Sequence, residues 1–344
     1  MRWILPCAAA AALAIAMPAG GAAARNFTIK LSYWVPPSHK LTPGYKEWGD
    51  SVEKASHGTI KYKLYPSSQL GSGKDEYDMV KRGIADFGLI NPGYTPGRFP
   101  IISVVDLPFM VKDALGAAKA LTRWYKAYAA KEMKDEYVCH VFTHHIGTLH
   151  TSKKIVRVPA DVRGLNIRSA NETMSRFITD MGGNSVQVPI MEAKDTLTKG
   201  ITDGITVTMD GIGPHSTFKF GEVTKYTLDI PLYVTVFTDN INKRMYDRMS
   251  AAQKKVIDDH CTPEWSARVY GYWYRDELSD LKEARALKGH VWTEVGPKEV
   301  ALWRDAAKPV YAYWAKQVKK AGYDPDKILS EVKASLKKDN ALYE

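Results

Sequence analysis

Apolar and polar residues change their spacing along the chain, and these changes predict an alternating order of strands and helices. In residues 26–34, Phe27, Ile29 and Leu31 alternate with polar residues, as on a half-buried strand. The expected order is strand 26–34, helix 42–56, strand 59–66, helix 74–82 and strand 84–91. This order is typical of a parallel α/β sheet, in which ligands bind beyond the carboxyl ends of the strands.

The rest of the chain extends the α/β pattern and then becomes helical. A long helix is expected within 106–133, strands within 136–152, 201–209 and 226–238, and helices from Ser250 onward. Because no internal repeat or low-complexity linker divides the chain, two lobes joined by crossing strands and helices around a hinge are expected. The expected division is lobe 1 at 25–145 plus about 238–290, lobe 2 at 146–237, and C-terminal helices at 291–344 packing across both lobes.

Residues 158–183 place an arginine where strand-like alternation gives way to helical spacing. Arg168 lies at the join, and Ser169 with Glu172 fits a capping box that starts the helix. A helix N-terminus already carries partial positive charge, so a permanent cation there needs a negative partner. Two explanations are open: an internal ion pair with Glu172 or Glu192, or an anion from outside the chain.

The N-terminal residues have the pattern of a secretory signal peptide. Arg2 precedes an alanine-rich apolar stretch, and Ala22 and Ala24 flank a small-residue cleavage site. A signal peptide is therefore expected at 1–24, with a mature protein from about Arg25 that is exported to the periplasm. No later segment has the roughly 18 unbroken apolar residues of a membrane span, so the protein is not expected to cross a membrane itself.

Charge and cysteine content narrow the classes of partner. The formal net charge of +10 suits acidic small molecules or an anionic membrane surface. Lysines are interspersed with acids and form no block of five like charges, which argues against nucleic acid. Cys139 and Cys261 remain after processing. Nothing local fixes their geometry, so two unpaired thiols are favoured over a disulfide.

Common catalytic and metal-binding signatures are missing from the sequence. It contains no G-x-S-x-G, H-E-x-x-H or C-x-x-C motif, so no enzyme activity, cofactor or metal is expected. The four histidines His140, His144, His145 and His150 resemble a metal cluster. On a strand, however, His140 and His144 would lie roughly 13 Å apart. A single His145 lining a polar cleft is the favoured functional role within this group.

Aromatic residues are numerous, and most of them fit a hydrophobic core. Stripes at helical spacing in the C-terminal third are expected to be core residues. Aromatic residues in predicted loops are better candidates for a ligand cleft, namely Trp34 after the first strand and Tyr94 after the third.

Several motifs occur in an order that resembles one transport family. These are "PPSHKL", "YPSSQLGSGKDEYDMVKRGIADFGLI", "DLPF", "PADVRGLNIRSANETMSRFITDMGGNSVQVPIMEAKDTLTKGITDG" and "KYTLDIPLY". From about Phe27 to Asp258 the chain resembles solute-binding proteins of the tripartite ATP-independent periplasmic (TRAP) transporters, of the DctP type. The resemblance implies a two-lobed α/β periplasmic binding protein fold, with a ligand cleft between the lobes and long helices at the C-terminus. It also implies capture of an organic anion and its delivery to the small and large membrane subunits of a permease.

The resemblance assigns Arg168 as the anchor of the ligand carboxylate. It places His39, the Gly71–Gly73 loop and Asn91 in the cleft from the first lobe, with Ile190 where the family often has an aromatic residue. Together with the residues argued above and the "DGITVTMD" segment, the expected ligand-binding residues are Arg168, Asn91, His39, Trp34, Ser72, Gly73, His145, Ile190, Val207 and Met209.

Two departures from the family pattern bear on the ligand. Residues 148–150 stand where family members commonly carry a second arginine, and Val207 stands where they carry an asparagine that helps hold the carboxylate. Both losses favour a bulkier and less polar anion, with an aromatic monocarboxylate as the leading candidate. The alternatives are an aliphatic dicarboxylate or hydroxy acid, an exported enzyme acting on an acidic small molecule, and a binding protein that serves a sensor kinase or another permease class.

Overall fold

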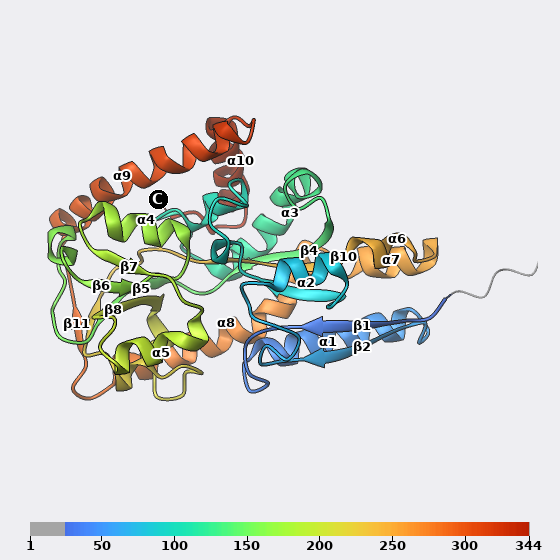
Figure 1. The fold of residues 1–344 in the computed structure, drawn as a ribbon, viewed down its shortest axis with the longest axis horizontal. Coiled ribbons are helices and arrows are strands. Elements are labelled where there is room, and N and C mark those ends of the chain that lie inside the picture. The colour runs from blue at the N-terminus through green and yellow to red at the C-terminus, as the bar shows by residue number, and fades with distance from the viewer. Residues whose placement is uncertain (1–24, 344) are drawn as a thin grey trace, which may run out of the picture.

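The structure, a computed structural model, describes residues 25–343 as two β-sheets flanked by helices (Figure 1). The first sheet contains β1 (Phe27–Ser32), β2 (Ile60–Tyr65), β3 (Phe87–Ile90), β4 (Glu136–Thr143) and β10 (Val236–Asn242). The second sheet contains β5 (Gly147–Thr151), β6 (Asn166–Arg168), β7 (Asn184–Val186), β8 (Gly204–Thr208), β9 (Tyr226–Leu228) and β11 (Val291–Thr293). The helices are α1 (Leu41–Ala55), α2 (Glu76–Arg82), α3 (Ala114–Glu132), α4 (Glu172–Asp180), α5 (Ile190–Thr198), α6 (Lys243–Asp247), α7 (Ala251–Asp259), α8 (Pro263–Arg285), α9 (Pro297–Lys320) and α10 (Pro325–Lys338).

The first sheet has the order β2-β1-β3-β10-β4. Strands β1, β2 and β3 run parallel, as the alternating order of elements predicts, and β10 runs antiparallel between β3 and β4. Ile29 and Leu31 of β1 are fully buried, and Tyr45 and Trp48 of α1 are buried in the same core. Because β1 and β3 are parallel, the loops that follow them leave the same edge of the sheet.

The second sheet has the order β11-β9-β5-β8-β6-β7. Strand β6 lies between β7 and β8 and is parallel to both, whereas β5 pairs antiparallel with β8 and β9. Helix α9 lies along α4 outside this sheet, where Trp303 contacts Phe177 with ring centroids 6.1 Å apart (Figure 1). The chain crosses between the sheets after β4 and again before β10.

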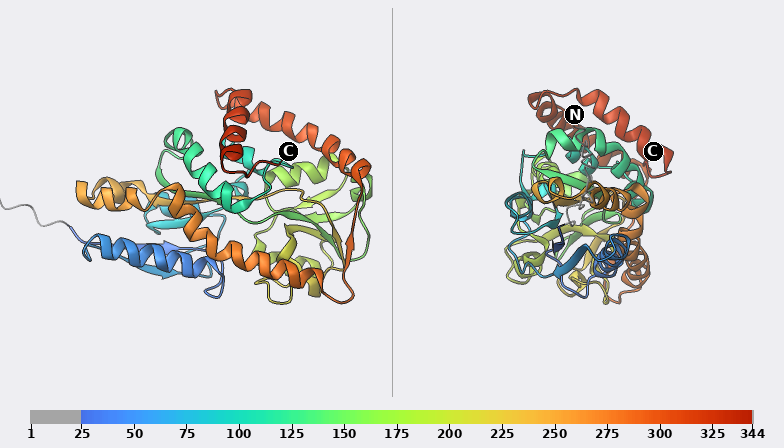
Figure 2. Two further views of the ribbon diagram at one scale, coloured as in Figure 1. Left: turned by 180° about the vertical axis from the view of Figure 1, so that it is seen from behind. Right: turned by 90° about the vertical axis from the view of Figure 1, so that its right-hand side faces the viewer.

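Helix α8 is the long element that contacts both sheets (Figure 2). Near its start, Ser266 Oγ donates to the Val141 carbonyl of β4, 3.0 Å away. At its end, Arg285 makes two hydrogen bonds, of 2.9 and 2.8 Å, to the carboxylate of Asp229, which follows β9. The middle of α8, around Trp273, therefore lies between the two sheets.

The expected α/β architecture and long C-terminal helices are present, with one difference at the start of the C-terminal segment. Residues 291–344 were assigned to C-terminal helices, and the first residues of this segment instead form β11, which pairs with β9. The strand places this end of the chain within the second sheet. The assignment of the two sheets to two lobes that move against each other remains a proposal.

The two cysteines form a disulfide, so the expectation of unpaired thiols is wrong. Cys139 lies on β4 and Cys261 follows α7, with their Cα atoms 4.4 Å apart. The pairing arises from tertiary packing, because α7 and the loop after it fold back beside β4 across a separation of 122 residues. No local pattern in the sequence reports such a contact.

Two further expectations concern a signal peptide and membrane-spanning helices. The expected signal peptide, residues 1–24, lies outside the described residues. Within residues 25–343, none of the helices has the length and apolar character that a membrane span requires.

The buried carboxyl group of Glu76, at the first residue of α2, makes stability depend on pH. Glu76 is fully buried, and burial raises its pKa from 4.5 to about 8, with the Ser32 hydroxyl opposing part of the rise. Between these two values the unfolded chain releases the proton and the folded chain keeps it, so stability falls as pH rises. Glu76→Gln removes this dependence. We expect the free energy of unfolding of the variant, relative to wild type, to rise by about 2 to 3 kcal/mol between pH 5 and pH 7.

Urea unfolding at the two pH values measures this difference. Glu264→Gln is the control, because Glu264 is exposed on α8. The difference between the Glu264 variant and wild type should stay constant with pH. Parallel pH profiles for wild type and the Glu76 variant would show that Glu76 does not keep its proton in the folded state.

Candidate functional site

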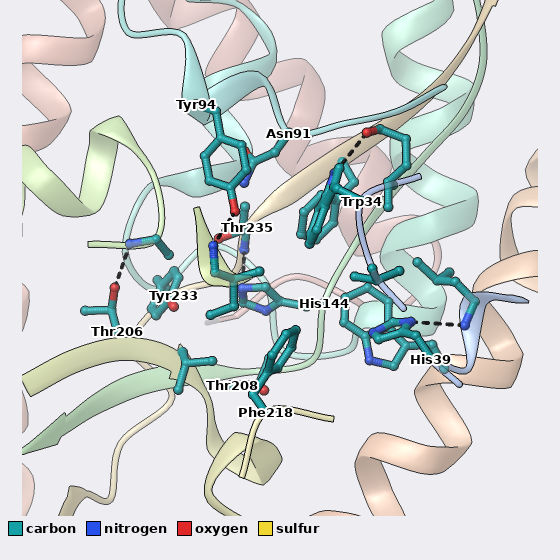
Figure 3. Close-up of a pocket in the computed structure, with 18 of the residues that line it drawn as sticks. Trp34, His39, Asn91, Tyr94, His144, Thr206, Thr208, Phe218, Tyr233 and Thr235 are labelled. Carbon is teal, nitrogen blue, oxygen red and sulfur yellow. Dashed lines mark hydrogen bonds between the residues drawn. The ribbon is translucent and has the colours of Figure 1, made fainter. Parts of the chain in front are cut away.

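A cavity lies between the second sheet and the loops that follow β1 and β3 (Figure 3). About 530 Å³ of empty space, part of it open to solvent, lies among its lining residues. Strands β6 and β8 supply one wall, β10 and the segment before it supply another, and Trp273 of α8 completes it. Most lining side chains are aromatic or aliphatic, and no aspartate or glutamate is among them. The cavity is therefore apolar, with a small number of polar groups.

Arg168 is the cationic side chain in the cavity wall. It is the last residue of β6 and is 2% exposed. Its Nε donates to the Val188 carbonyl at 3.0 Å and its Nη1 donates to the Thr206 carbonyl at 3.3 Å. A guanidinium has five N–H donors, so three remain for a further acceptor. The two backbone bonds fix the plane of the guanidinium, which favours two-point binding of a carboxylate.

Neither candidate internal partner neutralises Arg168. Glu172 accepts hydrogen bonds from the Gly97 amide at 2.6 Å and from the Tyr313 hydroxyl at 3.2 Å, and Glu192 is exposed in the first turn of α5. Throughout residues 25–343, Arg168 has backbone carbonyls as partners and no salt bridge with a carboxylate. Burying an unpaired charge is costly, so this arrangement suits an anion from outside the chain.

The helix after Arg168 starts differently from the expected capping box. Asn171 caps α4, with its Oδ1 accepting from the Met174 amide at 2.8 Å. Ser169 instead shares a hydrogen bond of 2.8 Å with Ser185. The Ser169–Glu172 box is therefore wrong, because the asparagine between these two residues is an equally good cap and lies closer to the first turn.

Tyr233 and Asn91 add neutral polar groups near the arginine. Burial raises the pKa of Tyr233, and the Thr206 hydroxyl and the Arg168 charge only partly oppose the rise, so the phenol keeps its proton. A Cβ at Gly147 would lie 2.6 Å from the Tyr233 ring, so a glycine is needed there. Asn91 Oδ1 accepts from the Gly93 amide at 3.0 Å, which leaves Nδ2 as its donor.

Aromatic rings form the remaining walls. Trp34 is fixed by a hydrogen bond of 3.0 Å from its Nε1 to the Leu89 carbonyl, and its ring centroid lies 6.1 Å from those of Tyr94 and Phe237. Trp273 lies 5.9 Å from Phe237. These tilted aromatic rings suit a flat, apolar ligand body.

His144 lines the cavity as a neutral ring. Its Nδ1 donates to the His145 carbonyl, and its Nε2 accepts from the Thr235 amide at 3.1 Å. Burial lowers its pKa to about 4, and the nearby Arg168 charge contributes in the same direction. His144 therefore adds shape rather than charge, packing edge-on against Tyr233 with ring centroids 5.4 Å apart.

Six of the ten expected ligand-binding residues line this cavity, and their roles toward a ligand remain proposals. They are Trp34, His39, Asn91, Arg168, Ile190 and Val207. In residues 148–150, where the family pattern has a second arginine, Thr148 donates to the Leu228 carbonyl and His150 bonds Thr227. Both side chains are engaged inside the second sheet. Arg168 is therefore the one cation in the described cavity wall.

The other four expected residues lie elsewhere. Ser72 is exposed, and Gly73 lies behind Trp34, where a Cβ would approach the indole to 2.9 Å. Met209 is buried in the core, and its amide donates to the Ile146 carbonyl. The ring of His145 lies beside Tyr274, at 5.7 Å, because neighbouring residues leave the end of β4 in opposite directions. His144 thus occupies the place expected for His145.

Sequence reasoning missed several lining residues, among them Phe218, Tyr233, Phe237 and Trp273. Three belong to loop or strand segments and one to a helix. Tyr233 ends the "KYTLDIPLY" motif, and the other three lie outside the quoted motifs. The position of Trp273 on a helical stripe resembled ordinary core. Within residues 25–343, no group of three or more His, Cys, Asp or Glu side chains has the arrangement of a metal site.

Comparison with known proteins gives a consistent family. The family model for bacterial extracellular solute-binding protein, family 7 (DctP), matches residues 31–317. A TRAP solute-binding protein from Rhodoferax ferrireducens, solved with copurified benzoate, is 27% identical and superposes with a TM-score of 0.83 over 91% of this chain and 98% of its own. A marine metagenome TRAP solute-binding protein specific for aromatic acid ligands, solved with 3-hydroxybenzoate, is 28% identical with a TM-score of 0.83 over 91% and 99%.

A curated relative extends the comparison to a third ligand. The 2,3-diketo-L-gulonate-binding periplasmic protein YiaO of Escherichia coli is 27% identical over 62% of this chain and 65% of its own length. The superpositions confirm the expected two-lobed binding-protein fold, and the family is non-enzymatic. The chain therefore belongs to the DctP family of TRAP solute-binding proteins.

Proposed function

We propose that this protein captures an aromatic monocarboxylate in the periplasm and delivers it to the small and large membrane subunits of a TRAP permease. The observation that carries the proposal is Arg168, a buried cation without a counter-ion among residues 25–343, in a cavity walled mostly by aromatic and aliphatic side chains. Two solved relatives above 25% identity hold benzoate and 3-hydroxybenzoate, which supports the same ligand class here.

The charged and polar side chains that line the cavity favour a ligand with one carboxylate over a ligand with two. A dicarboxylate would place a second charge in the cavity, where the described wall offers no second cation. Val207 lines the cavity, and it stands where the family pattern has an asparagine that helps hold the carboxylate. A sugar acid would leave several hydroxyl groups against aromatic walls, unsatisfied and desolvated.

A thermal-shift screen of the wild-type protein tests the ligand class. Benzoate and phenylacetate at 1 mM are expected to raise the melting temperature by several degrees, because a ligand that binds only the folded state stabilises it in proportion to the logarithm of its concentration over Kd. Succinate, malate and glucuronate at the same concentration are expected to give no shift. A dicarboxylate that stabilised the protein more than every aromatic acid tested would overturn the proposal.

Titration calorimetry of the strongest ligand then gives the affinity. Recovery of that ligand unchanged after prolonged incubation distinguishes binding from catalysis. Chemical conversion of the ligand would favour the exported-enzyme alternative.

A further inference from the structure

The cavity has two chemically different ends. Thr206, whose carbonyl accepts from Arg168, and Tyr233 lie on one side of the close-up, and His39 lies on the opposite side (Figure 3). His144 and Phe218 lie between these two groups in the same view. A ligand whose carboxylate is held by Arg168 therefore extends toward His39.

His39 has a defined tautomer. It is 3% exposed, and its Nδ1 accepts a hydrogen bond of 3.2 Å from the Leu41 amide. Burial lowers its pKa to about 3, and the charge of Lys40 contributes in the same direction, so the ring is neutral. A neutral imidazole that accepts at Nδ1 carries its proton on Nε2. Across residues 25–343, this Nε2–H makes no hydrogen bond.

The surroundings of His39 make this N–H a directed donor. The ring lies against Trp273 in an edge-on contact, with centroids 4.8 Å apart. Leu41, Phe218 and Phe237 line the cavity with it. Because this N–H has no partner among the described residues and its neighbours in this wall are apolar, an acceptor on the ligand forms a stronger hydrogen bond there than it would in water.

A second, smaller cavity behind His39 adds negative charge to this end. The two cavities share His39, Thr208, Phe218 and Trp273, and the smaller one is lined by Asp210, Asp276 and Asp280. The nearby cation, Lys40, is already paired with Asp276 at 2.9 Å. Burial raises the pKa of Asp280 to about 6, with Asp276 and Glu283 adding to the rise, so this carboxyl group is ionised at neutral pH. A second carboxylate placed here meets repulsion instead of a partner.

We propose that the Nε2–H of His39 selects a neutral hydrogen-bond acceptor, such as a ring hydroxyl, at the end of the ligand remote from its carboxylate. The same end rejects a second carboxylate. This inference rests on the proposed function, and it narrows the ligand class to aromatic monocarboxylates that carry a neutral polar substituent.

Binding of matched ligands to wild type and His39→Phe tests the inference by calorimetry. The series is benzoate, the three hydroxybenzoates, the three methylbenzoates and the phthalate isomers. Wild type is expected to bind one hydroxybenzoate about 3-fold to 10-fold more tightly than benzoate and than the methyl compound of the same shape. This ratio of affinities corresponds to the net contribution of one neutral hydrogen bond. The phenylalanine keeps the ring contact with Trp273 and removes the donor. Whatever its affinity for benzoate, this variant should bind the hydroxyl, methyl and unsubstituted compounds in a ratio of about 1-fold, because only the donor that distinguishes them is lost.

His215→Phe is the matched control, because His215 is an exposed histidine outside both cavities whose Nε2 lies 3.4 Å from Glu283. It should keep the wild-type preference. The wild-type comparison of hydroxyl with methyl compounds tests the donor even if the His39 variant does not fold. An unchanged preference in His39→Phe, methyl compounds that bind as tightly as hydroxyl compounds, or a phthalate isomer as tight as benzoate would each overturn the inference. Failure of every aromatic acid to bind wild type would instead overturn the proposed function.

Discussion

Arg168→Ala is expected to weaken binding of an aromatic monocarboxylate by roughly 10²-fold to 10⁴-fold, the equivalent of two charge-assisted hydrogen bonds. The guanidinium is held by the Val188 and Thr206 carbonyls and has three N–H groups left for the ligand. No other cation lines the described cavity, so nothing replaces it. Titration calorimetry with benzoate measures the loss.

Stability should change little or increase in this variant, because the mutation removes a buried charge that lacks a counter-ion. Arg176→Ala is the control. Arg176 lies on α4, the helix that follows Arg168, and it is paired at the surface with Asp180. It should bind the ligand as wild type does. A folded Arg168 variant with affinity within about 3-fold of wild type would show that the anion binds elsewhere.

Loss of the Cys139–Cys261 disulfide is expected to lower the free energy of unfolding by about 3 to 5 kcal/mol, because the bond closes a long loop in the unfolded chain. The bond joins β4 of the first sheet to the segment that precedes α8. Urea unfolding of Cys139→Ser/Cys261→Ser, compared with oxidised wild type, measures the change.

Reduced wild type should unfold like the double variant, and added reductant should leave the double variant unchanged. These two measurements separate the effect of the bond from that of the serine side chains. A difference below about 1 kcal/mol between oxidised wild type and the double variant would contradict the prediction.

The sequence predicts the parts of this structure that are encoded locally. Alternation in 26–34 gives β1, and the change of period around Arg168 gives the join of β6 and α4. The exact start of α4 was missed because Asn171 and Ser169 are both competent caps, and tertiary packing draws Ser169 to Ser185 instead. Local patterns indicate that a helix begins in a segment, but they define its first residue poorly.

The parts that were missed depend on contacts between distant segments. Phe237 contacts Trp34, Trp273 contacts Phe237, and Tyr233 lines the same cavity. These residues come from different elements, so no spacing in the sequence connects them. The disulfide has the same origin. The sequence favoured His145 over His144. Which of two neighbouring side chains at the end of a strand faces a cavity depends on how the strand pairs with its neighbours, and one segment of sequence does not reveal this pairing.

Helix α8 has a mechanical consequence for ligand capture. Its start is bonded to β4 and its end to the residue after β9, so any change in the angle between the sheets must bend, slide or unpair this helix. Gly271 lies between these attachments, nearer to Ser266, where a Cβ would meet no atom closer than 3.6 Å, and a glycine inside a helix is destabilising. Two residues further on, Trp273 faces the cavity. If the two sheets rotate against each other on ligand binding, the bend in α8 would fall beside Trp273, and the fluorescence emission of this indole would report the rotation.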